Sequence, residues 1–261
     1  MDVIIDRHRL RFSKDFALLN PDNTTIIFLH DSLGCIELWK NFPEQITSQT
    51  GYNTIAYDRQ GYGKSDPFTI KERELDYLEK EALVLGKILD IIPSKDIILF
   101  GHSDGGSIAL LTAALFPEKI IGIITEGAHV FVEQETLNGI KAAKLAYHKT
   151  SLKEKLSKYH EDKTDAVFRL WTETWLSEKY KLWNIEQYLP KIKCPSLIIQ
   201  GEQDEYGTID QVHSIIKNTS GKSTSVIIPK IGHTPHRENT NIVIKNVVSF
   251  INSLKQDKQH Y

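Results

Sequence analysis

Residues 100–108 read FGHSDGGSI and follow directly on the apolar run DIIL at 96–99. The stretch holds a Gly-x-Ser-x-Gly pattern with Ser103 at its centre. After it the chain is apolar nearly all round over 106–117, which predicts a buried helix that Pro117 ends. A serine between a buried strand and a helix, with glycines on both sides, is typical of a nucleophile held in a strained turn. A glycine-rich turn with a purely structural role is the alternative that this stretch alone leaves open.

Outside this stretch, short apolar runs alternate with amphipathic patterns of helical period. The runs are rich in Ile, Leu, Val and aromatic residues, as is typical of strands in a parallel sheet that is buried on both faces. They lie at 24–30, 52–58, 96–101, 120–125, 196–201 and 225–229, and the main helical patterns lie at 75–92 and 241–255. The alternation predicts an open α/β sheet. The opening pair DVIIDR and RLRFS predicts an antiparallel edge hairpin, and the polar ending QDKQHY at 256–261 predicts a solvated tail.

The alternation of strand and helix patterns is interrupted between residues 129 and 188. This stretch contains helix-like segments such as LNGIKAAKLAYHK and AVFRLWTETWLSEKY, together with three of the four tryptophans, and it lacks a convincing strand. The segment KIKCPSLIIQG then resumes the sheet pattern. We therefore predict a helical insertion over 129–188 in a core formed by 1–128 and 189–261.

Composition and charge limit the class of protein. The chain has 261 residues, of which 40% are hydrophobic and 25% charged, and this fits one α/β domain with an insertion. A net charge of -2 predicts no general attraction to nucleic acid or to acidic membranes. Cys35 and Cys194 are in no metal-ligand spacing, and we expect neither a metal nor an organic cofactor. The two thiols, a start without an apolar signal region, and the lack of a membrane-spanning stretch predict a cytoplasmic location.

Two polar loops downstream carry partners for a serine nucleophile. A serine hydroxyl needs a base, and the base needs an orienting acid. The run at 196–201 is followed by GEQDEYG, which contains Asp204, and the run at 225–229 is followed by KIGHTPHRE, which contains His233. The order Ser, Asp, His, with each residue at the carboxyl end of a strand, is typical of a hydrolytic triad on an open α/β sheet. We predict that Ser103 is the nucleophile, Asp204 the acid and His233 the base.

The acid and the base each have a neighbouring alternative. Glu202 or Glu205 could replace the predicted acid, and His236 competes with His233 as the base. We favour His233 because it comes sooner after the strand and follows a flexible glycine.

An oxyanion hole needs two backbone N–H donors. One is expected from Asp104, the residue after the nucleophile. The other is expected from the loop HDSLGC at 30–35, where Ser32 is the preferred donor and Asp31 its near neighbour.

The stretches FLHDSLG, AYDRQGYGKSD, GHSDGGSIALLTAALFP, IIQGEQDEYG and IGHTPHRE together resemble the α/β-hydrolase superfamily, over nearly the whole chain. The resemblance implies a mostly parallel eight-stranded sheet with helices on both faces and a helical cap, which would match 129–188. It also implies that Ser103, Asp204 and His233 are nucleophile, acid and base. The chain departs from the family at Asp31, where a glycine is usual, and a carboxylate there could restrict the loop or lie near the pocket.

Within the superfamily, GHSDGG with a downstream HVFVE segment is similar to bacterial esterase-like hydrolases and to amino-acid ester hydrolases of the valacyclovir hydrolase type. In the latter, the acid after the nucleophile helps to bind the ammonium group of the substrate. The resemblance implies that Asp104 could attract a cationic α-amino ester, and the alternative is that Asp104 stabilises a helix N-terminus. Asp31 and His129 are further candidates for contact with substrate.

The sequence therefore predicts a serine hydrolase that cleaves small carboxylic esters through an acyl-enzyme at Ser103. One alternative is hydrolysis of an amide, lactone, thioester or carbon–carbon bond by the same triad. Another is a non-catalytic ligand-binding protein on the same scaffold. The expected partner is a small-molecule ester, with neither nucleic acid nor a membrane, and no oligomeric state is predicted.

Overall fold

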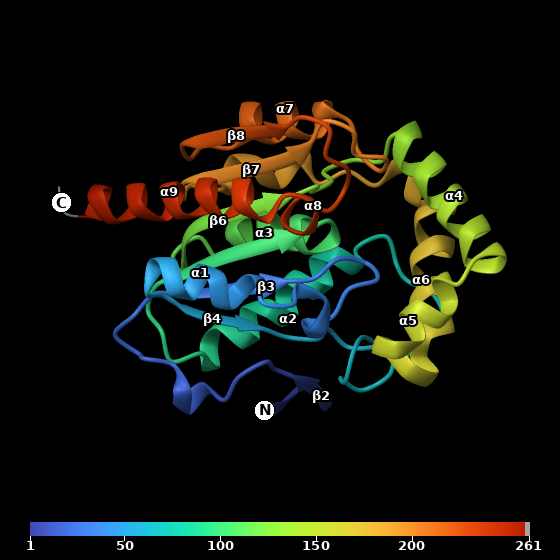
Figure 1. The fold of residues 1–261 in the computed structure, drawn as a ribbon, viewed down its shortest axis with the longest axis horizontal. Coiled ribbons are helices and arrows are strands. Elements are labelled where there is room, and N and C mark those ends of the chain that lie inside the picture. Colours follow the sequence, from blue (N-terminus) through green and yellow to red (C-terminus); the bar gives the residue numbers. More distant parts are fainter. Residues whose placement is uncertain (259–261) are drawn as a thin grey trace.

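Six parallel strands form the central sheet in a computed structural model of the protein, which describes residues 1–258 (Figure 1). Their order across the sheet is β4-β3-β5-β6-β7-β8. The strands are β3 (Thr25–Leu29), β4 (Asn53–Ala56), β5 (Ile97–His102), β6 (Ile120–Glu126), β7 (Ser196–Gly201) and β8 (Ser223–Ile228). Each overlaps one of the apolar runs, so the six strands and the open α/β sheet predicted from the sequence are confirmed.

Alternate residues of the strands supply two separate hydrophobic clusters. In β3, Ile27 and Leu29 belong to one cluster and Ile26 and Phe28 to the other. This alternation follows from the two-residue period of a strand, and it explains why the central strands are apolar at every position. Each face of the sheet is therefore covered by helices.

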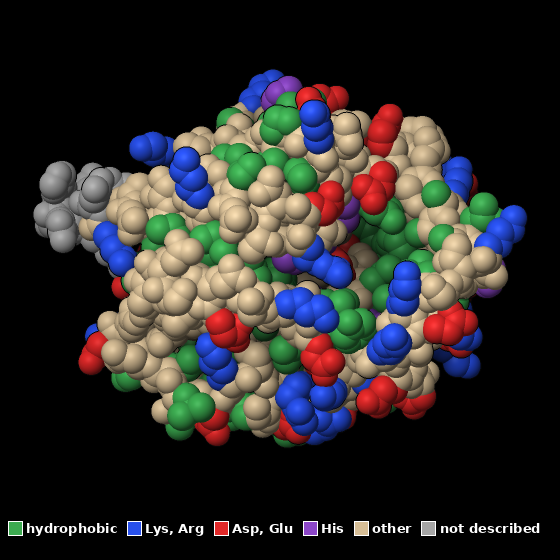
Figure 2. Space-filling model, viewed as in Figure 1, with side chains coloured by type: hydrophobic (Ala, Val, Ile, Leu, Met, Phe, Trp, Pro, Cys, Tyr) green, Lys and Arg blue, Asp and Glu red, His purple; other side chains and the backbone are tan. Residues whose placement is uncertain are grey.

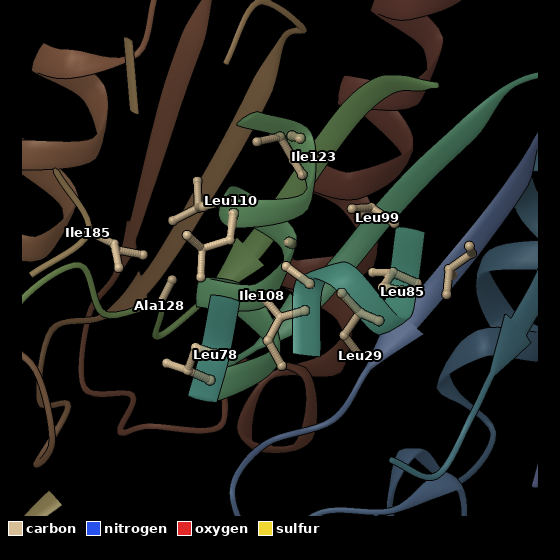
Figure 3. Close-up of a cluster of buried hydrophobic side chains, with 14 of the residues drawn as sticks. Leu29, Leu78, Leu85, Leu99, Ile108, Leu110, Ile123, Ala128 and Ile185 are labelled. Carbon is tan, nitrogen blue, oxygen red and sulfur yellow. The ribbon is translucent and has the colours of Figure 1, made fainter. Parts of the chain in front are cut away.

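The helices of the core lie in two layers (Figure 1). One layer is formed by α2 (Tyr77–Ile91), α3 (Asp104–Leu115) and α7 (Ile209–Asn218), and the other by α1 (Phe42–Thr50) and α9 (Thr240–Lys258). Helix α3 is apolar nearly all round because it packs between the sheet and α2. Its residues Ile108 and Leu110 belong to the same buried cluster as Leu78, Leu85 and Leu99 (Figure 3). The helices predicted at 75–92, 106–117 and 241–255 are confirmed within a few residues.

The first two strands form a hairpin of their own. β1 (Asp2–Ile5) and β2 (His8–Arg11) pair antiparallel in a separate two-stranded sheet, as the predicted hairpin requires. A single bridge between Phe12 and Tyr57 connects this hairpin to the end of β4. The expectation of one eight-stranded sheet is therefore corrected to six strands plus a hairpin. The reason is that β2 and β4 are connected only by this one bridge, so the four-residue strand β2 does not pair continuously with β4.

The segment between β6 and β7 is helical and lies beyond the carboxyl ends of the strands (Figure 1). It contains α4 (Gln134–Lys149), α5 (Leu152–His160) and α6 (Thr164–Trp175). Its two ends meet, because the Ile185 N–H donates to the Val130 carbonyl over 2.8 Å. The helices expected here are present, while the division of the chain into 1–128, 129–188 and 189–261 stays a prediction.

The remaining elements are short. Helix α8 spans Pro235–Glu238, and 3₁₀ helices span Phe16–Leu18, Ile36–Trp39, Glu161–Lys163, Tyr180–Leu182 and Glu186–Lys191. Helix α9 continues three residues into the polar ending at 256–261, and the last three residues of that ending lie outside the described residues.

Within residues 1–258, no helix combines the length and the apolar character needed to cross a membrane. Cys35 is buried, Cys194 is half-buried, and neither forms a disulfide. The cytoplasmic location stays a prediction.

Candidate active site

Ser103 lies in a sharp turn between β5 and α3. Its backbone has φ 54° and ψ -120°, outside the regions that non-glycine residues usually occupy. The turn is tight because the helix approaches the sheet closely: a Cβ on Gly105 would lie 2.0 Å from the Leu29 carbonyl oxygen. The Ser103 N–H donates to the Glu126 carbonyl over 2.8 Å, which fixes the turn to β6. The strained strand-to-helix turn that the Gly-x-Ser-x-Gly pattern predicts is present.

Asp204 and His233 come together in the loops that follow β7 and β8. His233 Nδ1 lies 2.8 Å and 2.9 Å from the two carboxylate oxygens of Asp204. Because an ionised carboxylate can only accept, Nδ1 carries the proton and Nε2 is left as the acceptor. The Tyr206 N–H and the Gln200 amide also donate to Asp204, over 2.8 Å and 2.7 Å. Burial opposes the ionisation of Asp204, but the neighbouring His233 outweighs it and lowers the pKa of this carboxyl.

The alternatives to these two residues are placed differently. His236 Nδ1 lies 2.6 Å from Glu126 in a buried pair, and His236 does not line the cavity that contains Ser103. Glu202 accepts the Lys230 N–H, and Glu205 accepts the main-chain N–H of His233 rather than its ring.

Gly127 allows the His233–Asp204 pair to lie close to the end of β6. It follows β6 with φ 54°, and a Cβ there would lie 2.9 Å from the His233 ring. This glycine and its neighbour Glu126 were not predicted from the sequence. A glutamate at the end of the apolar run IIGIITEG was the available signal.

The loop after β3 is held so that the Ser32 N–H remains unpaired. The Leu33 N–H donates to Asp31 Oδ1 over 2.9 Å. The Asp31 carbonyl accepts from the Arg59 guanidinium and from His30 Nδ1, each over 2.8 Å. Within residues 1–258, the Ser32 N–H has no acceptor.

The second predicted oxyanion donor is the first N–H of α3. Asp104 opens this helix, where backbone N–H groups have no intrahelical partner. In the described part of the chain, its N–H also has no acceptor outside the helix. Both N–H groups predicted for an oxyanion hole are thus unpaired in the part of the chain that the structure describes.

The Asp104 side chain is 1% exposed. The Tyr77 hydroxyl donates to one carboxylate oxygen over 3.0 Å, and the Arg59 guanidinium lies 3.9 Å from the same oxygen. The other oxygen, Oδ1, has no hydrogen-bond partner within residues 1–258. The carboxylate therefore keeps one free acceptor beside the nucleophile, at the N-terminus of α3, where negative charge is favoured.

A cavity of about 220 Å³ brings these groups together. Its apolar wall consists of Leu33, Ile140, Trp171, Trp175 and Tyr206, and its polar lining includes Ser103 and His233. Three carboxylate residues also line it, namely Asp31, Asp104 and Glu205, and no Lys or Arg is among the described lining residues. Figure 2 shows the surface hollowed between the ends of the strands and the helices α4–α6. The cavity is therefore small and acidic.

His129 also lines the cavity. Its Nε2 donates to the Tyr206 carbonyl over 2.9 Å, and its buried Nδ1 has no partner in the described chain. Burial lowers the pKa of His129, and the proximity of His233 lowers it further, so the ring is neutral.

His102, the last residue of β5, is buried and forms an ion pair with Asp31, whose side chain is 30% exposed. Its Nε2 lies 2.7 Å from the His233 carbonyl oxygen, and its Nδ1 lies 3.3 Å from Asp31 Oδ2. Nε2 donates to the carbonyl, and the ion-pair contact of Nδ1 with the Asp31 carboxylate favours the protonated ring. Burial alone would lower the pKa of His102, but the hydrogen bond and charge of Asp31 outweigh it and raise the pKa to about 9. His30 is the opposite case, since burial and the Arg59 charge lower its pKa well below the usual value.

We expect the stability supplied by His102 to be lost as the pH rises. The pKa of His102 is raised on folding from 6.5 to about 9, so its contribution is complete below pH 6.5 and disappears as the pH passes about 9. A shift of this size corresponds to on the order of 3 kcal/mol, or a fall in Tm of roughly 5–10 °C. The measurement is Tm against pH for the wild type and His102→Gln. A difference between the two curves that stays constant over this range would contradict the ion pair.

Comparison with known proteins places the chain among hydrolases. The family model described as serine aminopeptidase, S33, matches residues 25–240. Serine hydrolase BPHL from Homo sapiens is 28% identical over 202 residues, which cover 71% of this chain and 64% of that protein. A 2-hydroxy-6-oxononadienedioate/2-hydroxy-6-oxononatrienedioate hydrolase from Burkholderia vietnamiensis is 26% identical over 256 residues, covering 88% of this chain and 87% of the relative. The matched segment thus spans slightly less than two thirds of the human relative's length.

Solved structures share the fold. The crystal structure of a membrane phospholipase A described as a bacterial virulence factor superposes with a TM-score of 0.79 at 18% identity, covering 98% of this chain and 86% of that one. At this level of identity the similarity concerns the arrangement of the sheet and helices.

Proposed function

The chain belongs to the serine aminopeptidase S33 family of α/β-hydrolases, and from that premise we propose that it cleaves small carboxylic esters with Ser103, Asp204 and His233. One observation carries this proposal: His233, whose Nδ1 is held by Asp204, lines the same cavity as a serine on a strained turn. A buried carboxylate that fixes the Nδ1 proton leaves Nε2 ready to act as a base.

In the proposed mechanism, Ser103 Oγ attacks the ester carbonyl while His233 Nε2 takes the hydroxyl proton. Asp204 holds the ring in this tautomer and stabilises the imidazolium. The N–H groups of Ser32 and Asp104 donate to the oxyanion, and His233 then protonates the leaving alcohol. Water attacks the acyl-enzyme in the same way and releases the acid. The Ser103 hydroxyl makes no hydrogen bond with His233 in the described structure. We expect that bond to form in the substrate complex, where catalytic contacts commonly tighten.

The lining of the cavity favours a substrate with a free amine. Asp104 and Glu205 contribute carboxylates to the lining, and Asp104 Oδ1 is an unused acceptor beside the nucleophile, whereas the charge of Asp31 is offset by His102. A dicarboxylate, such as the compound in the name of the Burkholderia relative, would meet carboxylates and no Lys or Arg in this lining. Hydrolysis of an amide bond next to a free amine, as the name of the family suggests, is the second candidate, and the same acidic lining favours it.

The test is a panel of substrates that differ in one feature at a time. It contains p-nitrophenyl esters of short acids, amino-acid p-nitrophenyl esters with a free or an acetylated amine, amino-acid p-nitroanilides, and a dienedioate. We expect ester turnover, with kcat/KM about 10- to 100-fold higher for the free amine than for its acetylated form, since a hydrogen bond to a charged group contributes about 1.5–3 kcal/mol. Faster cleavage of the anilides would favour the second candidate.

Asp104→Asn tests the recognition role with an internal control. The variant should lose most of the preference for the free amine while it retains turnover of the acetylated ester. Asp210→Asn, at an exposed position on α7, should leave the preference unchanged. A preference that survives in Asp104→Asn would contradict this role, and a folded wild type that cleaves no member of the panel would contradict the proposed function.

A further inference from the structure

One buried histidine connects the three segments that carry the proposed catalytic groups. His102 precedes Ser103 at the end of β5 and is 2% exposed. Its Nδ1 side faces Asp31 in the loop after β3, and its Nε2 donates to the main-chain carbonyl of His233 in the loop after β8. A single ring therefore contacts the oxyanion loop, the nucleophile turn and the loop of the base.

The negative charge of Asp31 would disfavour the oxyanion of the proposed reaction unless a positive charge balances it. Asp31 directly precedes Ser32, whose N–H would donate to the oxyanion, and both residues line the cavity. A carboxylate there opposes a second negative charge, and the low dielectric constant of a buried site strengthens this repulsion. The imidazolium of His102 offsets the charge of Asp31 and leaves the pair neutral.

The groups around His102 are consistent with a protonated ring. Asp31 faces it from the loop after β3, and Glu126 contributes a second negative charge from β6. The rings of His233 and His236 lie 5.0 Å and 5.2 Å from it, between centroids. Burial lowers the pKa of His236 although Glu126 opposes this, so His236 is a neutral neighbour that donates its Nδ1 proton to Glu126.

We propose that Asp31 and His102 form a positioning pair for the reaction proposed above, on which this inference rests. The pair cancels the charge of Asp31 next to the oxyanion donor of Ser32. Through the carbonyl of His233, it also fixes the loop that carries the base. Neither residue touches the reacting atoms, and both act through the groups that do.

A double-mutant cycle on ester hydrolysis tests the pair. His102→Gln keeps an amide donor for the His233 carbonyl but leaves Asp31 unbalanced, and we expect kcat to fall about 10- to 100-fold with KM changed less than about threefold. Adding Asp31→Asn removes the unbalanced charge and should recover part of the lost kcat, so that the two effects are far from additive. His213→Gln and Asp210→Asn, which alter an exposed His–Asp pair, are matched controls and should leave kcat unchanged. Full activity of His102→Gln, or additive losses in the double variant, would overturn the proposal.

The pH dependence of kcat distinguishes a positioning role from a merely structural one, because a structural role would not shift it. The measurement uses the wild type and Asp31→Asn, so it does not depend on whether His102→Gln folds. In the wild type, kcat should fall as the pH rises through about 9, where His102 loses its proton. In Asp31→Asn the fall should begin at lower pH, because the charge that retains the proton is gone. An alkaline fall at the same pH in both proteins would overturn the proposal.

A titration of the histidine ring by ¹⁵N NMR separates this inference from the proposed function. His102 should remain an imidazolium up to about pH 9 in the wild type and in Ser103→Ala. A neutral His102 at pH 7 in an active esterase would overturn the positioning pair alone. A charged His102 in a protein that cleaves no ester would overturn the proposed reaction, and the positioning role with it.

Discussion

Replacing Ser103 with alanine should lower kcat/KM for ester hydrolysis by about 10⁴-fold or more, with no comparable change in stability. The reason is that the hydroxyl oxygen is the proposed nucleophile, and no neighbouring group can take its place in the turn. The hydroxyl makes no hydrogen bond in the described structure, and the N–H of residue 103 would still donate to the Glu126 carbonyl. The measurement is steady-state hydrolysis of p-nitrophenyl esters by both proteins, together with Tm.

The matched control is Ser48→Ala on the exposed side of α1, where the hydroxyl donates to the Gln45 carbonyl. Its kcat/KM should equal that of the wild type. If Ser103→Ala kept more than about one hundredth of the wild-type activity while it remained folded, another nucleophile would have to be sought.

Asp204→Asn should have the second-largest effect, a fall in kcat of about 10³- to 10⁴-fold with little change in KM. The amide that replaces the carboxylate cannot stabilise the imidazolium that forms when His233 takes the serine proton. It also loses the bidentate contact with Nδ1, which fixes the proton on that nitrogen. The measurement is kcat and KM on a neutral ester, so that recognition of an amine does not enter.

Glu205 offers the decisive comparison for this variant. It lies in the same loop and lines the same cavity, but it contacts the main-chain N–H of His233 and not the ring. Glu205→Gln should therefore keep most of the activity on the neutral ester. The reverse result, an active Asp204→Asn and an inactive Glu205→Gln, would reassign the acid.

The positions of the strands along the chain were predictable because the sequence pattern of each strand is local. The continuous apolar runs in β3, β5 and β7 follow from burial on both faces, and the glycine-rich turn marks the end of β5. The predicted residues Ser103, Asp204 and His233 each follow such a strand end. Parallel strands bring their carboxyl ends to one edge, so the order along the chain was enough to predict a common site.

The interactions that tune the site were not predictable, because they join residues far apart in the chain. Glu126 and His236 are separated by 110 positions, and nothing local to either indicates the other. The pairing of Asp31 with His102 depends on how the loop after β3 approaches β5. The need for glycine at position 127 arises only when the His233 ring arrives beside it. The separate hairpin likewise depends on where the chain leaves β2.

For Asp104, the sequence left two roles open: binding the amine of a substrate and stabilising the N-terminus of a helix. The structure is compatible with both roles. The residue opens α3, as a helix-stabilising acid would, and it also lines the cavity and has one buried oxygen without a partner within residues 1–258. Arg59 and Tyr77, which hold its other oxygen, come from distant segments. The choice between the roles depends on the substrate panel.

The most direct test of the proposed serine hydrolase mechanism is to trap the nucleophile. The folded protein would be incubated with an organophosphorus ester reagent, such as diisopropyl fluorophosphate, and the adduct located by intact-mass and peptide mass spectrometry. We expect one adduct per chain, on Ser103, formed in step with the loss of ester hydrolysis and greatly slowed in Asp204→Asn. An adduct on another residue, or complete loss of hydrolysis with Ser103 unmodified, would contradict it.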